Sequence, residues 1–113
     1  MTGLGRLIIR SALTFNADGI YNYQLNTRNA KADTVVANGV TINSGAIFSF
    51  LGFGNRPLPT GTAFTVIDNR SAQPIAGTFF NLADGSTFTA NGNTFQANYE
   101  GGNGNDLTLT VVP

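Results

Sequence analysis

The chain has 113 residues, a formal net charge of zero and only 11% charged side chains. A chain of this length forms one domain or a piece of a larger protein. The charge balance gives no basis for steering nucleic acid or an anionic membrane towards it. Its polar surface must therefore consist mainly of Asn, Thr, Ser and Gln.

Three residue types that often carry chemistry or cross-links are absent: Cys, His and Trp. Packing rather than disulfides must then hold the fold. The usual general base and the thiol nucleophile are also missing. The six Asp and Glu residues fall mostly in turns or at strand ends, and no glycosidase-like pair can be named. We therefore predict that the chain is not an enzyme and has no catalytic residues.

Short apolar strands separated by turns are predicted along the first half of the chain. They cover residues 7–9, 13–15, 21–25, 34–37, 40–42 and 47–50. In the third strand, Tyr21, Tyr23 and Leu25 alternate with polar residues and therefore share one face. Such frequent turns with little charge are typical of a β-solenoid, but they also suit a β-sandwich or jelly roll. No apolar run approaches the roughly 18 residues of a spanning helix, so no membrane insertion is expected.

The second half of the chain is predicted to end in hairpins. Residues 52–62 contain Pro57 and Pro59 and are expected to form an irregular loop. The pair Asn91-Gly92 between two alternating segments is a strong hairpin signal. We predict one β domain with three parts: strands stacked as rungs in 1–51, the loop in 52–62, and a strand followed by a C-terminal antiparallel meander in 63–113.

The strand pattern also predicts the core. Its expected members are the apolar residues on the shared faces: Leu13, Phe15, Tyr21, Tyr23, Val36, Ile42, Phe48, Phe50, Phe64, Val66, Phe79, Phe88, Phe95, Leu107 and Leu109.

The segment GGNGNDLTL matches the nonapeptide of calcium-binding β-helix repeats. Calcium would need Asp106, with Glu100 nearby, and ligands from a second stacked turn. The nonapeptide occurs once, so we favour a glycine-rich hairpin turn in which Gly101, Gly102 and Gly104 are free to take positive φ angles. A Ca²⁺-stabilised adhesin domain stays an alternative.

Four segments together carry a resemblance to a known family: LTFNADGIYNYQLN, ADTVVANGVTI, FTVIDNRSAQPIAGTFFNLADGSTF and TFQANYEGGNGNDLTLTVV. They resemble the C-terminal region of autotransporter-associated β-strand repeat proteins of Gram-negative bacteria. The resemblance implies a right-handed β-helix with a terminal cap that contains hairpins. It implies a secreted or surface stalk, structural or adhesive, and no shared catalytic residues.

We therefore expect a non-enzymatic extracellular module that caps the C-terminal end of a repetitive stalk, in a fragment without its signal peptide. Residues 5–10 would stack on a neighbouring rung of the parent chain, or on a second copy of this chain, because an open sheet edge invites pairing. The alternative is a carbohydrate-binding module. For it, Tyr99 is predicted to be the most accessible tyrosine, and Arg56 and Arg70 are either solvated or border a groove for a polysaccharide.

Overall fold

The structure, a computed structural model, describes residues 6–102 and 104–113. Within these ranges the chain forms strands, turns and irregular segments but no helix, so the prediction of an all-β protein is confirmed. The strands are β1 (Arg6–Ile8), β2 (Leu13–Phe15), β3 (Ile20–Asn26), β4 (Lys31–Ala32), β5 (Thr34–Ala37), β6 (Val40–Ile42), β7 (Ile47–Phe53), β8 (Ala63–Asn69), β9 (Thr87–Ala90), β10 (Asn93–Gly101) and β11 (Asp106–Val112).

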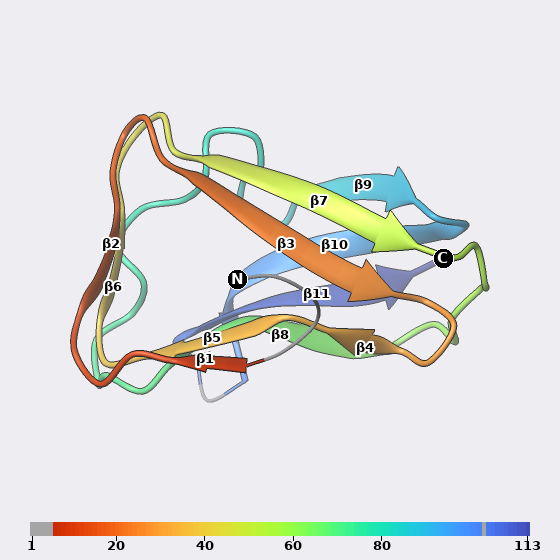
Figure 1. Cartoon of the computed structure of the whole chain (residues 1–113), viewed down its shortest axis with the longest axis horizontal. Coiled ribbons are helices and arrows are strands. Elements are labelled where there is room, and N and C mark those ends of the chain that lie inside the picture. Colours follow the sequence, from red (N-terminus) through yellow and green to blue (C-terminus); the bar gives the residue numbers. More distant parts are fainter. Residues whose placement is uncertain (1–5, 103) are drawn as a thin grey trace.

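Each of the first three strands pairs in parallel with the strand that lies four places later in the strand order. β1 pairs with β5, β2 with β6 and β3 with β7. Leu13 lies opposite Val40 and Ile20 lies opposite Ile47, so the partner is 27 positions later in both cases. Figure 1 shows the consequence: the path β1–β2–β3 is repeated alongside by β5–β6–β7.

β8 is the strand at which the pairing changes from parallel to antiparallel. It pairs in parallel with β5 on one side and antiparallel with β11 on the other. β11, β10 and β9 continue as an antiparallel meander, as predicted, and the sheet order is β1-β5-β8-β11-β10-β9. The turn between β9 and β10 has positive φ at both Asn91 (52°) and Gly92 (80°), the conformation of a type I′ hairpin turn.

Three sheets enclose the core. The six-stranded sheet curves around behind the three-stranded sheet β4-β3-β7, and the pair β2-β6 closes one end (Figure 1). Most of the predicted core residues are buried, and Leu13, Phe15, Phe50 and Phe88 are half-buried at the margin of the same cluster. The neighbours Phe79 and Phe80 differ in exposure: Phe79 is 1% exposed and belongs to the core, whereas Phe80 is 77% exposed.

Two boundaries differ from the sequence prediction. β7 extends to Phe53, so the irregular loop begins at Gly54 rather than at Gly52. Residues 70–86 contain no strand of their own, apart from isolated bridges at Ala76 and between Phe79 and Leu82. This second irregular segment was not predicted, because its turn residues are spread along it without a proline pair like that of the first loop.

Candidate functional site

The glycine-rich turn closes the hairpin between β10 and β11. Gly102 and Gly104 have φ angles of 58° and 103°, as expected for turn glycines. Gly101 does not take positive φ, so its predicted role is wrong in this respect. It lies in the strand opposite Asp106, where a Cβ atom would collide with the side chain of Thr108. Gly101 is therefore needed for close packing.

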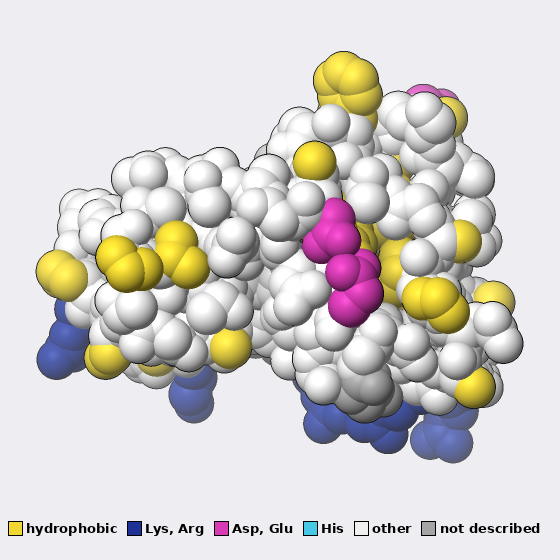
Figure 2. Space-filling view, turned by 180° about the vertical axis from the view of Figure 1, so that it is seen from behind, with side chains coloured by type: hydrophobic (Ala, Val, Ile, Leu, Met, Phe, Trp, Pro, Cys, Tyr) yellow, Lys and Arg dark blue, Asp and Glu magenta, His cyan; other side chains and the backbone are white. Residues whose placement is uncertain are grey.

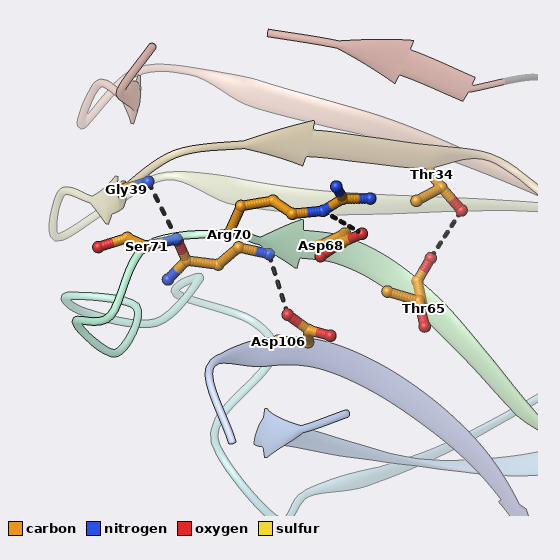
Figure 3. Close-up of polar contacts among 8 residues, drawn as sticks. Thr34, Gly39, Thr65, Asp68, Arg70, Ser71 and Asp106 are labelled. Carbon is orange, nitrogen blue, oxygen red and sulfur yellow. Dashed lines mark hydrogen bonds and ion pairs between the residues drawn. The ribbon is translucent and has the colours of Figure 1, made fainter. Parts of the chain in front are cut away.

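Asp106 joins the ends of two strands. Its side chain is buried, and its Oδ1 accepts a hydrogen bond from the backbone N–H of Asn69 at 3.0 Å (Figure 3). Asn69 is itself fully buried, and its Oδ1 accepts hydrogen bonds from the N–H groups of Gly39 and Ser71, both at 3.1 Å. The carboxylate thus satisfies a backbone donor where β8 ends.

Glu100 lies in a different environment from Asp106. It is exposed, and a hydrogen bond with the side chain of Asp84 raises the pKa of its carboxyl group. Asp84 also accepts a hydrogen bond from the backbone N–H of Tyr99 at 3.1 Å. Figure 2 shows two acidic side chains in contact on the face that it displays. In the part of the chain that the structure describes, no group of three or more acidic side chains is placed to hold a metal ion.

Tyr99 is buried, and the prediction that it is the most accessible tyrosine is wrong. Its side chain is 3% exposed. The hydroxyl donates to the carbonyl of Leu82 at 2.5 Å and accepts from the N–H of Phe79 at 3.1 Å. Burial raises the pKa of Tyr99 to about 12. The signal was present in the sequence, because Tyr99 alternates in phase with Phe95 and Ala97, which are also buried.

The two predicted arginines lie in different settings. Arg70 forms an ion pair with Asp68, with Nε 3.1 Å from Oδ2 (Figure 3). Arg56 instead donates from its guanidinium to the carbonyl oxygen of Arg28 at 3.3 Å. Both Arg28 and Arg56 line a hollow of about 430 Å³ between residues 27–30 and 56–59. Arg28 has no sequence feature that links it to Arg56, because the two are joined only by tertiary structure.

The N-terminal edge of the strand stack is apolar. β1 is an edge strand of its sheet. Three apolar side chains are exposed at this edge: Leu7 at 45%, Ile8 at 57% and Ile20 at 60%. Leu7 and Ile20 also line a hollow of about 240 Å³, together with Leu13 and Phe15. The predicted contact segment 5–10 lies here, although Gly5 is outside the described residues.

A second apolar hollow, of about 520 Å³, lies between β7 and β9. Phe48, Phe50, Phe80 and Phe88 contribute to its wall. The side-chain amide of Asn81, which also lines this hollow, donates to the carbonyl of Phe48 at 2.7 Å and accepts from the N–H of the same residue at 2.9 Å. The amide therefore takes the place of a neighbouring strand at this point on β7.

Comparisons of the chain with protein-family models, with curated proteins and with solved structures find no match. Among the described residues there is no helix that is both long and apolar enough to span a membrane.

Proposed function

We propose that the chain is a non-enzymatic structural module that closes the C-terminal end of a repetitive, extracellular β-solenoid stalk. The observation that carries this proposal is the difference between the two ends of the strand stack. At one end, β1, β2 and the start of β3 are paired on one side only within the described residues, and apolar side chains are exposed there; the other end is followed by an antiparallel meander.

The parallel pairings support a solenoid rather than a sandwich. We define a rung as three successive strands, so β1–β3 are the first rung and β5–β7 the second. Their partners are offset by 27 or 28 residues on all three faces. A sandwich of the immunoglobulin type is antiparallel and would pair neighbouring strands through hairpins. A right-handed coil is expected because parallel crossover connections are almost always right-handed.

The meander supports the role of a terminal cap. An uncovered end of a parallel stack exposes N–H and C=O groups that invite aggregation. After β8 the chain reverses direction, and Phe88 and Phe95 pack against Phe50 of the second rung, with ring centroids 5.2 and 5.5 Å apart from it. A further parallel rung is thereby replaced by a hairpin.

The N-terminal edge would receive the preceding rung of the parent protein. β4 pairs with β3 only at Leu25 and Asn26, so it does not occupy the start of that strand. We propose a secreted or surface-attached parent of the autotransporter-associated type. The basis is the low content of charged residues, 11%, and the four sequence segments that resemble this family.

Self-association tests this proposal. When the 113-residue chain is studied on its own, two copies should pair through this edge. Substituting Leu7→Lys or Ile20→Lys should shift the chain towards monomer, because a lysine on an apolar contact is unfavourable. Sedimentation equilibrium across a concentration series measures the effect. Phe80→Lys is the matched control, since Phe80 is an exposed aromatic away from this edge and should leave association unchanged. A chain that is monomeric at all concentrations, or one whose association responds to Phe80→Lys alone, would contradict the proposal.

A further inference from the structure

The loop that carries Arg56 is held by hydrogen bonds from the side chains of Asn93, which is buried, and Asn91, which is half-buried. Asn93 is 5% exposed, and its amide donates to the carbonyl of Arg56 at 3.0 Å and accepts from the N–H of Leu58 at 2.7 Å. Asn91 donates to the carbonyl of Gly54 at 2.7 Å. The loop is thus fixed at three backbone groups, although it has no regular secondary structure.

The turn that carries Arg28 is joined to the same loop. Thr27 is 1% exposed, and its hydroxyl donates to the carbonyl of Phe53 at 3.0 Å and accepts from the N–H of Arg56 at 3.1 Å. Ala30 ends this turn with a φ angle of 53°, which a residue with a Cβ atom adopts only at an energetic cost. Two fixed backbone segments therefore present the two arginines to one hollow.

The positive charge of this hollow is not neutralised within the described residues. Arg28 and Arg56 are exposed, and neither forms an ion pair with a described residue. The ion pair found among the described residues joins Arg70 to Asp68, which do not line this hollow. Figure 2 shows that Lys and Arg side chains gather along one margin of the molecule, apart from the pair of acidic side chains on the displayed face. A chain with zero net charge thus has a cationic margin, which attracts anions locally.

The lining of the hollow indicates the chemistry of its ligand. A guanidinium binds a carboxylate through two parallel hydrogen bonds. Pro57, Leu58 and Pro59 add an apolar wall, and Asn29 offers an amide that can both donate and accept. The apolar face of a sugar ring, its hydroxyl groups and an acidic substituent match these three features. We infer that the hollow binds a carboxylate-bearing sugar, as one unit of an acidic polysaccharide.

Titration with an oligogalacturonate tests the inference. At low salt we expect amide chemical-shift changes confined to residues 27–31 and 54–59, and no such changes with the fully methyl-esterified oligomer, which keeps the ring but loses the charge. Arg28→Gln and Arg56→Gln should each weaken binding by about tenfold or more, since tenfold is the lower end of the range for losing a hydrogen bond to a charged group. Arg56→Lys should fall between the wild type and Arg56→Gln, because lysine keeps the charge but not the planar fork.

Arg10→Gln is the matched control, since it removes the same charge from an exposed position outside the hollow. The fold should survive the other substitutions, because the backbone of Arg56, not its side chain, is held by Thr27 and Asn93. Equal weakening by Arg10→Gln would show attraction by net charge alone. Equal binding of the esterified oligomer, or tighter binding of poly-glutamate, would also overturn the inference. So would the absence of binding to oligomers of galacturonate, mannuronate and glucuronate alike.

Discussion

At the scale of single residues, two buried tyrosines differ in whether the hydroxyl group forms hydrogen bonds. Tyr99 makes two hydrogen bonds, to Leu82 and from Phe79. Tyr23 is fully buried, and its hydroxyl has no hydrogen-bond partner among the described residues. A buried polar group without a partner loses its hydration and gains nothing in return. Tyr23 therefore contributes to stability through its ring alone.

This contrast predicts opposite effects for the same substitution. Tyr23→Phe should raise the free energy of unfolding by about 1 kcal/mol, because it removes an unsatisfied hydroxyl. Tyr99→Phe should lower it by about 1–2 kcal/mol, because it leaves the Phe79 N–H and the Leu82 carbonyl without their partner. Urea denaturation followed by circular dichroism measures both. A loss of stability in Tyr23→Phe as large as in Tyr99→Phe would contradict this account of the two hydroxyls.

At the scale of elements, the junction between β8 and β11 depends on a polar network. The carboxylate of Asp106 on β11 accepts a hydrogen bond from the backbone N–H of Asn69 on β8 (Figure 3). The side chain of Asn69 in turn accepts hydrogen bonds from the N–H groups of Gly39 and Ser71. This junction lies where parallel pairing gives way to antiparallel pairing. The carboxylate of the glycine-rich nonapeptide thus has a structural use that needs no metal.

Asp106→Ala should therefore destabilise the chain by about 1–3 kcal/mol, because the buried N–H of Asn69 loses its acceptor. The loss should be the same in calcium and in a chelator, and the wild-type melting temperature should also be unchanged between the two. Asp18→Ala, at an exposed turn position, is the control and should change stability by less than about 0.5 kcal/mol. A calcium-dependent rise in melting temperature that Asp106→Ala abolishes would instead favour the metal site, by linkage.

At the scale of the whole molecule, the core is rich in aromatic rings that connect both rungs to the meander. Phe79 packs against Tyr21 and Phe48, and Phe50 packs against Phe88 and Phe95. Burial raises the pKa of Tyr21, Tyr23 and Tyr99 above the ordinary tyrosine value of about 10. The core therefore contains all three tyrosines of the chain in their protonated form.

Alkaline pH should unfold the protein cooperatively. In the unfolded chain these phenols lose their protons near pH 10, whereas the folded state retains the Tyr99 proton up to about pH 12. The stabilisation from the raised pKa is complete below pH 10 and is lost as the pH rises towards 12. Tyrosinate absorbance and circular dichroism should change together in a pH titration, and Tyr23→Phe should make the decline less steep. Full tyrosinate absorbance in a chain that keeps its folded spectrum would refute this prediction.

Local features of the sequence predicted most of the strands, the hairpin at Asn91-Gly92 and most of the core, including Tyr21 and Tyr23, but not the short strand β4. The physical reason is that side-chain alternation and turn conformation depend on residues that are near neighbours in the chain. The same alternation, followed along β10, would also have placed Tyr99 in the core. Local alternation could not predict how much of residues 70–86 is irregular, because hydrogen bonds to residues distant in the sequence hold this segment, such as those from Ala76 to Val40 and from Phe80 to Ala46.

The sequence by itself determined an all-β chain with a meander at its end and few charges. Only the tertiary structure decided that strands 27 residues apart pair in parallel, that Asp106 meets Asn69, and that Arg28 meets Arg56. Each of these contacts joins residues separated by about 27–37 positions. Alternation is satisfied by any register that keeps the apolar face inward, so the choice among registers depends on how all the strands bury their faces together.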